Sequence, residues 1–431
     1  MDEFKSGVKI PTTSGTPVVI EKHLAEGGQG HVYLVTFNGE KKALKWYKPS
    51  AIKEPAKFRE NLQGNVDRGA PDAAFLWPQA VTMPYEGSFG YVMDLRKDDY
   101  HEFEDYMLGK VKFGSFKAAT EACIRIVSAF RLLHNRGYCY QDLNAGNFFI
   151  HPSTGDVLIC DNDNVAPNSM DTFILGTPQY MAPEVVAGRS RPNTQTDRFS
   201  LAVVLFTILC MNHPLEGKRW TDTPCLTPQY EKKLYGDGAV FLYDPTDSSN
   251  RPVKGVHNNV MKRWGYMPAY IKDTFIQAFS KDAIANPGHR LRELDWLKVL
   301  IRFQGDIVRC PHCRNEVFIQ NASDTKCDGC GRVMPIAHTL KFSDYTLTAA
   351  KGTRVYRCQL SACNADNALD RIGVVVENPQ KPGVLGFRNM SQDTFEGRTP
   401  SGSVRLVKPK EVVPLKAGIT LKTPAGTIEI C

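Results

Sequence analysis

The sequence predicts an α+β chain of three consecutive units, and three observations support this. Its 431 residues exceed one ordinary domain, since a domain typically contains roughly 100–200 residues. Residues 1–305 mix strand-like and helix-like segments, whereas residues 306–335 are turn-rich and punctuated by cysteines. Residues 336–431 are rich in Val, Thr, Gly and Pro in short alternating runs. We therefore expect a two-lobed region, a small cysteine module and an all-β, sandwich-like unit.

The composition excludes several classes of protein. Hydrophobic residues make up 42% and charged residues 23% of the chain, as in ordinary globular proteins. The net charge is +7 and no Lys/Arg-rich run occurs, which disfavours nucleic-acid binding. The longest apolar stretch, residues 199–211, is shorter than the about 20 residues that cross a membrane. Residues 1–5 lack the apolar core of a signal peptide. We therefore expect a cytoplasmic protein with reduced cysteines and no membrane or nucleic-acid partner.

A small β-rich lobe is expected over about residues 15–95. Its strand-like segments are residues 18–20, 32–35, 43–45 and 91–93. The tip Gly27-Gly28-Gln29-Gly30 lies between the first two strands, whereas Walker and Rossmann motifs place their glycines at a helix N-terminus. A glycine-rich hairpin can fold over a nucleotide and bring its backbone to the phosphates. A plain hairpin turn carries the same signature and stays an alternative.

A larger, mainly helical lobe is expected over about residues 96–305. Apolar residues at helical spacing predict a helix over 118–134. Residues 148–150 and 157–159 flank a turn and predict a short hairpin. The pattern becomes mainly helical after Asp197, where the apolar stretch predicts a buried core helix.

Further motifs follow the glycine-rich tip in a fixed order. They are Lys45 on the third strand, Asp142-Leu143-Asn144-Ala145-Gly146-Asn147, Asp161 after the hairpin, Gly176-Thr177-Pro178, Ala182-Pro183-Glu184, and Asp197. In this order and spacing the motifs resemble the protein-kinase family over roughly residues 15–303. The resemblance implies a bilobal protein-kinase fold. It also implies a Ser/Thr protein kinase that transfers the γ-phosphate of ATP to protein hydroxyls, its own included.

The resemblance assigns catalytic roles to four residues. Lys45 is expected to anchor the phosphates of ATP, and Asp142 to accept or orient the proton of the substrate hydroxyl. Asn147 and Asp161 are expected to hold Mg²⁺ or Mn²⁺ through hard oxygen ligands. Lys45 also needs a carboxylate partner on a helix, for which we choose Glu60.

Glu54 is the alternative partner for Lys45, because spacing alone does not separate the two glutamates. The resemblance also places the nucleotide against a set of residues around the cleft. The expected ATP-binding residues are Gly27, Gly28, Gly30, Val32, Ala43, Lys45, Glu60, Met93, Asp94 and Leu95. Met93, Asp94 and Leu95 correspond to the gate and hinge that face the adenine.

Three residues are expected to be structural. Glu184 is expected to pair with Arg290 and brace the helical lobe, and Asp197 to hydrogen-bond the catalytic-loop backbone. Thr177 is expected to contact Asp142.

The chain departs from the family pattern at several positions. Ala25 replaces the first loop glycine, and Gln141 replaces the arginine that normally holds a loop phosphate. Activation-loop phosphorylation is therefore not expected to be required. Asn144 replaces a lysine near the γ-phosphate, which puts the rate and the residue preference in doubt. Asp163 replaces the glycine two residues after Asp161, and it can assist with Mg²⁺.

Two alternatives to an active protein kinase follow from these departures. One is an ATP-binding pseudokinase scaffold that acts through its C-terminal units, but all four catalytic residues are present. The other is a small-molecule kinase, which the peptide-substrate segment around residues 176–184 disfavours. Ser169 and Thr172, just before that segment, are the expected autophosphorylation sites.

Two C-x₂-C knuckles predict a structural zinc site. Cys310, Cys313, Cys327 and Cys330 supply four thiolates, as in a closed tetrahedral Zn²⁺ site, within an expected zinc ribbon over residues 306–335. Fe–S ligation is the alternative, and His312 can replace one cysteine. Cys358 and Cys363 form a looser pair, either free thiols or half of a second metal site with a residue such as His338.

The C-terminal unit, residues 336–431, faintly resembles a forkhead-associated β-sandwich, a phosphothreonine-binding fold. Arg388 and Asn389 are candidate phosphate ligands, but a sandwich used for docking alone is the favoured interpretation.

The order kinase, zinc ribbon and sandwich is similar to a bacterial kinase subfamily of stress-resistance operons. The segments Asp161-Asn162-Asp163-Asn164-Val165 and His213-Pro214-Leu215-Glu216-Gly217 carry this similarity. It implies a von Willebrand A-type protein as substrate and a metal-dependent phosphatase as antagonist.

Overall fold

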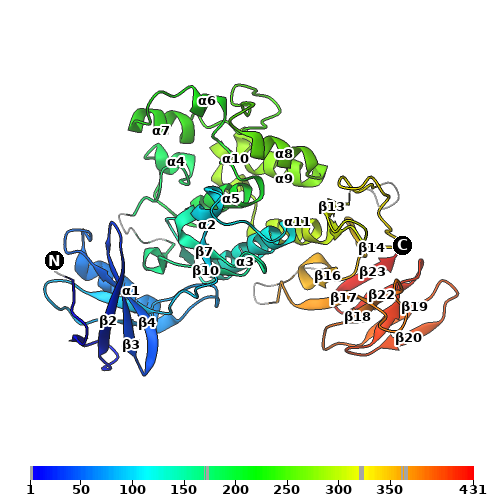
Figure 1. Cartoon of the computed structure of the whole chain (residues 1–431), viewed down its shortest axis with the longest axis horizontal. Coiled ribbons are helices and arrows are strands. Elements are labelled where there is room, and N and C mark those ends of the chain that lie inside the picture. The colour runs from blue at the N-terminus through cyan, green and yellow to red at the C-terminus, as the bar shows by residue number, and fades with distance from the viewer. Residues whose placement is uncertain (1–2, 169, 171–173, 320–324, 361–362, 364–366) are drawn as a thin grey trace.

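The computed structural model describes residues 3–168, 170, 174–319, 325–360, 363 and 367–431. It contains a β-rich lobe, a helical lobe, a cysteine-bearing hairpin and a two-sheet β-unit, in that order along the chain (Figure 1). The predicted order, a two-lobed region followed by a sheet-rich C-terminal region, is confirmed.

The N-terminal lobe is a six-stranded antiparallel sheet of order β1-β2-β3-β4-β6-β5. Its elements are β1 (Lys9–Ile10), β2 (Val18–Glu26), β3 (Gly30–Phe37), β4 (Glu40–Tyr47), α1 (Pro55–Arg68), β5 (Ala80–Val81) and β6 (Gly90–Met93). The glycine-rich tip joins β2 to β3, as predicted. Gly30 is required by close packing, since a Cβ there would lie 2.0 Å from the Trp46 carbonyl oxygen.

Two long helices form the centre of the C-terminal lobe. Helix α3 (Phe116–Asn135) matches the predicted helix and begins where Ser115 Oγ accepts a hydrogen bond from Ala118 N at 3.0 Å. Helix α5 (Thr194–Cys210) contains the apolar stretch and is buried around almost its whole circumference. In the described parts of the chain, no helix is both long and apolar enough to cross a membrane.

Shorter elements surround these two helices. The helices are α2 (Phe103–Met107), α4 (Pro183–Val186), α6 (Lys218–Thr221), α7 (Pro228–Tyr235), α8 (Asn258–Tyr266), α9 (Ala269–Ala278), α10 (Lys281–Ala285) and α11 (Glu293–Asp306). The strands are β7 (His101–Glu102), β8 (Tyr138–Cys139), β9 (Phe148–Ile150), β10 (Val157–Ile159) and β11 (Ala166–Pro167). Strands β9 and β10 form the predicted hairpin, with Val157 opposite Ile150.

The C-terminal region begins with the hairpin β12 (Ile307–Arg309) and β13 (Glu316–Phe318), followed by two sheets. Their strands are β14 (Thr339–Lys341), β15 (Thr346–Thr348), β16 (Arg354–Tyr356), β17 (Arg371–Glu377), β18 (Leu385–Asn389), β19 (Phe395–Arg398), β20 (Val404–Val407), β21 (Val412–Pro414), β22 (Thr420–Thr423) and β23 (Gly426–Ile430). The orders are β15-β14-β23-β22-β19-β20 and β16-β17-β18-β21, and both sheets contribute to one apolar core.

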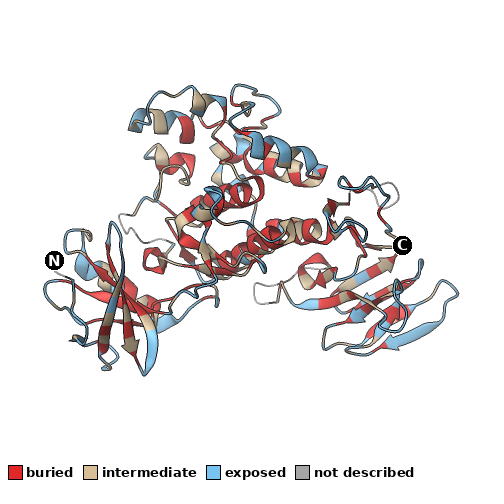
Figure 2. Cartoon of the chain, in the orientation of Figure 1, coloured by how far each residue is buried: buried red, intermediate tan, exposed pale blue. Residues whose placement is uncertain are grey.

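The C-terminal region packs directly on the helical lobe. Cys358 belongs to the same apolar core as α3 and α5, and Arg131 of α3 donates a hydrogen bond to the Cys363 carbonyl at 3.2 Å. Phe318 of β13 stacks on Phe303 of α11 with ring centroids 5.4 Å apart. Buried residues accordingly run from α3 and α11 towards the sheets (Figure 2). Among the described residues, Cys358 and Cys363 join no cluster of metal-ligating groups.

Candidate active site

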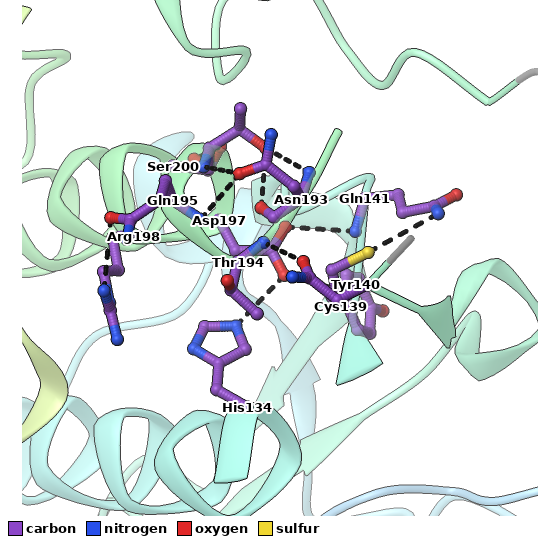
Figure 3. A network of polar contacts seen from close by, with 12 residues as sticks. His134, Cys139, Tyr140, Gln141, Asn193, Thr194, Gln195, Asp197, Arg198 and Ser200 are labelled. Carbon is purple, nitrogen blue, oxygen red and sulfur yellow. Dashed lines mark hydrogen bonds and ion pairs between the residues drawn. The ribbon is translucent and has the colours of Figure 1, made fainter. Parts of the chain in front are cut away.

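The catalytic loop is held by a buried carboxylate at the start of α5. Asp197 accepts hydrogen bonds from the backbone N–H groups of Tyr140, at 2.6 Å, and Gln141, at 3.1 Å (Figure 3). These contacts confirm the predicted role of Asp197. Gln141 has φ of 75°, a left-handed conformation that a non-glycine residue keeps only when its surroundings enforce it.

A histidine bridges this carboxylate to a second one. The His134 ring lies 3.1 Å from Asp197 Oδ2 (Figure 3). It also lies 2.8 Å from Glu293 Oε1, and Arg198 contacts Glu293 at 2.9 Å. Burial alone would lower the pKa of His134, but hydrogen bonds to the two carboxylates raise it to about 9. Against the effect of burial, the same contacts lower the pKa of Glu293 to about 2. His134 is therefore a buried imidazolium at neutral pH.

We expect the free energy of unfolding to fall at alkaline pH because of His134. A raised pKa contributes stability that is complete below the ordinary value of 6.5 and disappears as the pH passes about 9. The loss should be on the order of 2–3 kcal/mol. Thermal unfolding between pH 6 and 10 measures it, with His134→Gln as the comparison. Equal pH dependence in the native chain and the variant would contradict the prediction.

The fold holds Asp142 through one carboxylate oxygen. Its Oδ1 accepts hydrogen bonds from Thr177 N at 2.9 Å, Thr177 Oγ1 at 3.0 Å and Asn144 Nδ2 at 3.2 Å. No described donor contacts Oδ2, which can therefore accept a substrate hydroxyl proton. The predicted contact between Thr177 and Asp142 is confirmed.

The predicted metal ligands lie beside this loop. Asn147 donates its side-chain N–H to the Asp142 carbonyl at 2.7 Å, which leaves Asn147 Oδ1 as an acceptor. The Asn147 carbonyl accepts from Cys160 N at 3.0 Å, so Asp161 lies close by. Burial and the neighbouring Asp163 charge raise the pKa of Asp161, while Lys45 opposes them. This oxygen-rich, partly open corner fits a hard divalent cation.

Lys45 is bound by two carboxylates from the other lobe. Its Nζ lies 3.1 Å from Asp161 Oδ1 and 3.0 Å from Asp163 Oδ2. Asp163 is fully buried and also accepts hydrogen bonds from the hydroxyls of Tyr47, at 2.7 Å, and Tyr91, at 3.2 Å. Burial would lower the pKa of Lys45, but the charges of Asp163 and Asp161 raise it above its ordinary value, so the ammonium stays charged.

The predicted pairing of Lys45 with Glu60 is wrong. Glu60 lies on the exposed side of α1, and the alternative Glu54 is also exposed and contacts Lys57 at 3.7 Å. The inward face of α1 carries Asn61 and Asn65 instead. Each donates its side-chain N–H to the Val165 carbonyl at 2.9 Å, so amides rather than an ion pair attach this helix.

Sequence reasoning assigned Asp163 a role beside Mg²⁺ and missed that it binds Lys45. The available signal was an aspartate in a position normally held by glycine. Asp163 replaces the helix carboxylate as the fixed partner of Lys45.

Several of the predicted nucleotide-side residues lie close together in the N-terminal lobe. Strand register places Val32 opposite Lys45, and Ala43 opposite Met93. Val32, Ala43, Met93 and Leu95 belong to one apolar cluster. Asp94 follows β6 and its side chain pairs with Lys42 at 2.7 Å. Gly27 and Gly28 stand at the tip, where a Cβ would meet no atom within 4 Å.

The helical lobe contains the predicted brace. Arg290 donates two hydrogen bonds to Glu184, at 2.8 and 2.7 Å, in a buried bidentate pair. Arg290 also donates to the Gln195 carbonyl at 3.0 Å and so joins the Ala-Pro-Glu segment to α5.

The four knuckle cysteines converge. Their sulfur atoms all lie within 4.8 Å of one another, with Cys310 and Cys330 at 3.8 Å and Cys313 and Cys327 at 3.3 Å. Tetrahedral coordination with Zn–S bonds of about 2.3 Å needs sulfur separations of about 3.8 Å. The donor set therefore fits a zinc ion.

The structure also bears on the candidate phosphate ligands of the C-terminal unit. The Asn389 amide is buried and bonded to the carbonyls of Asp393 and Val407, so its candidate role as a phosphate ligand is not supported. Arg388 is exposed. Ser169 and Thr172 lie outside the described residues.

Comparisons with known proteins are consistent with this geometry. Residues 18–231 match the family model of the protein kinase domain. The chain is 26% identical over 243 residues to the serine/threonine-protein kinase Nek11 of Macaca fascicularis and of Homo sapiens, which covers 50% of this chain and 36% of each relative. It is 31% identical over 112 residues to protein kinase C-like 1 of Candida albicans, which covers 25% of this chain and 10% of that protein.

A solved structure is also similar, the kinase domain of Mycobacterium tuberculosis PknI. It has a TM-score of 0.46 and 18% identity, and it covers 69% of this chain and 98% of that domain. The chain spans about a third of the length of the Nek11 relatives. Of these comparisons, the match of residues 18–231 to the protein kinase domain model bears most directly on function.

Proposed function

We propose that this chain is an active Ser/Thr protein kinase that transfers the γ-phosphate of Mg²⁺-ATP, or Mn²⁺-ATP, to protein hydroxyls, including its own. One observation carries the proposal. Asp142, Asn147 and Asp161 meet around an ordered loop, and Lys45 from the opposite lobe reaches Asp161. The kinase domain match and the serine/threonine-kinase relatives support the same activity.

The roles follow from the atoms available in the cleft. Oδ2 of Asp142 would accept the proton of the substrate hydroxyl, while Thr177 holds Oδ1 in place. Asn147 and Asp161 would hold the Mg²⁺ that neutralises the charge on the transferring phosphoryl group. Lys45 would contact the α- and β-phosphates.

The presence of Asn144 does not favour the pseudokinase scaffold over an active kinase. Its Nδ2 bonds to Asp142 Oδ1 and its own Oδ1 accepts from Gly146 N at 3.0 Å, so it shapes the catalytic loop. Because Asn144 replaces a lysine, one cation fewer lies near the γ-phosphate. We expect this to slow phosphoryl transfer without abolishing it.

Transfer of label from γ-labelled ATP tests the proposal. We expect the native chain with Mg²⁺ to label itself or a generic Ser/Thr acceptor, and a chelator to abolish the label. A thermal shift with nucleotide runs in parallel. A nucleotide shift without transfer would overturn the enzyme proposal and favour the ATP-binding pseudokinase scaffold.

We further propose that residues 306–335 form a zinc ribbon with structural Zn²⁺. A single zinc ion per chain is expected, and its removal should expose the β12–β13 hairpin because so short a module cannot fold on apolar burial alone. Hydrogen exchange with and without chelator measures this, with Cys310→Ser as the ligand variant. Cys225→Ser, at an exposed cysteine outside the cluster, is the control. Unchanged exchange in metal-free Cys310→Ser would contradict the prediction.

The proposal extends to the protein's partners and its location. The subfamily similarity supports a von Willebrand A-type protein substrate, an antagonistic metal-dependent phosphatase and a cytoplasmic location. The forkhead-associated-like sandwich would then serve in docking.

A further inference from the structure

A large cavity opens where the helical lobe, the cysteine hairpin and the sandwich meet, away from the active site. We call it the junction basin, and its volume is about 870 Å³. It is lined by the first turns of α3, the β9–β10 turn, the β12–β13 hairpin, and residues of β16 and β17. A cavity of this size accommodates a ligand as large as a short peptide segment.

Positive charge dominates the junction basin. Its two acidic side chains, Glu121 and Glu316, are already engaged. Glu316 accepts hydrogen bonds from Phe116 N at 2.5 Å and Lys117 N at 3.3 Å. Glu121 is contacted by Arg125 at 3.2 Å, Arg354 at 3.6 Å and Gln304 at 2.7 Å. The six basic side chains in its lining are Lys117, Arg125, Arg309, Lys351, Arg354 and Arg371.

Three of these cations lack an acidic partner. Among the described residues, no carboxylate lies within 4.0 Å of Lys117, Arg309 or Arg371. The Lys117 ammonium has one polar contact in the lining, the Ile307 carbonyl at 3.4 Å. Burial lowers the pKa of Lys117, and the nearby Arg354 charge lowers it further, while the charges of Glu316 and Glu121 oppose these effects. An anion that entered the junction basin would add to the favourable side of this balance.

The rest of the lining is mixed. It contains the apolar or aromatic residues Ile124 of α3, Ile307 of β12, Leu369 and Tyr356, and the polar residues Ser115, Ser153, Thr154 and Gln304. A ligand with charge alone would leave this surface uncovered, whereas a polypeptide can alternate acidic and apolar side chains. Charge complementarity across such a surface raises the association rate and selects the partner.

We propose that the junction basin docks an anionic peptide segment of the kinase's protein substrate, with carboxylate or phosphate side chains beside apolar ones. That the peptide belongs to a substrate rests on the proposed function, whereas binding of an anionic peptide to the junction basin does not. Lys117, Arg309 and Arg371 bind the anionic groups, and the apolar residues cover the neighbouring side chains.

Fluorescence anisotropy with the full chain tests the proposal. The probes are three labelled peptides that alternate leucine with glutamate, with phosphothreonine, or with lysine. We expect the native chain to bind the glutamate or the phosphothreonine probe and not the lysine probe, and the better of the two identifies the anionic group. The double variant Arg309→Glu/Arg371→Glu should bind at least about tenfold more weakly.

The matched control is Arg388→Glu/Lys416→Glu, which makes the same charge change on exposed residues of the sandwich outside the basin. We expect it to bind like the native chain. The proposal is overturned if neither anionic probe binds, if the basin variant binds like the native chain, or if the control weakens binding equally.

A kinetic arm separates this proposal from the kinase proposal. Asp142→Asn should bind the probes like the native chain, because it does not touch the junction basin. With a Ser/Thr acceptor that carries the anionic segment, the basin variant should raise KM about tenfold without changing kcat. Generic acceptors should be labelled at the native rate. If the chain binds the probes but transfers no phosphate, the kinase proposal is contradicted and the docking proposal is not.

Discussion

Asp142→Asn is expected to lower kcat for phosphoryl transfer by about 10²–10⁴-fold, the usual contribution of a positioned general base. The substitution is informative because it preserves the local fold. An asparagine Oδ1 can still accept the hydrogen bonds from Thr177 and Asn144. Only the second oxygen, which no described donor contacts, is exchanged for an amide that cannot take a proton.

Single-turnover transfer measures the effect, and nucleotide-induced thermal shifts show that ATP binding survives. Asp67→Asn, the same chemical change at an exposed position of α1, is the control and should leave the rate unchanged. An Asp142→Asn chain that transfers phosphate at the native rate would remove Asp142 from the mechanism.

Asp163→Asn is expected to have the largest effect on stability, about 3–5 kcal/mol, because it leaves a buried ammonium without its fully buried partner. Lys45, Tyr47 and Tyr91 all belong to the N-terminal lobe, whereas Asp163 follows β10 of the other lobe. One carboxylate therefore joins the lobes at three points. We expect the variant to unfold at a lower temperature and to show a raised KM for ATP.

Asp161→Asn provides the comparison for this prediction. The Asp161 side chain is 40% exposed, against 0% for Asp163, so its loss should cost less stability while it removes a metal ligand. We therefore expect the two variants to differ in kind: Asp161→Asn stable and inactive, Asp163→Asn unstable. Chemical denaturation compares them, and equal stability of Asp163→Asn and the native chain would contradict the role assigned to Asp163.

Short-range patterns allowed much of the site to be predicted. The loop that presents Asp142 and Asn147, the hairpin before Asp161 and the two cysteine knuckles each lie within a few residues of sequence. Their motifs can therefore be recognised in the local sequence, although Asp197 of α5 holds the catalytic loop in place. The α5 core helix and the sheet-rich end likewise follow from apolar runs and alternation.

The partner of Lys45 could not be predicted in this way. Glu60 and Asn61 are neighbours in sequence but differ by about 100° around a helix, so only the packing of α1 decides which faces inward. The carboxylate that binds Lys45 comes from 118 residues further along the chain. Its position depends on how the two lobes approach each other.

Local spacing and periodicity encode the two-lobed order of elements, the catalytic loop and the four-cysteine cluster, so these could be read from the chain alone. Three features follow only from the packing of distant segments: Asp163 binds Lys45, His134 bridges Asp197 and Glu293, and three units enclose the junction basin. Each of these brings together charges from distant segments. Their energies depend on burial and on distances of 3–4 Å, which exist only after the chain has packed.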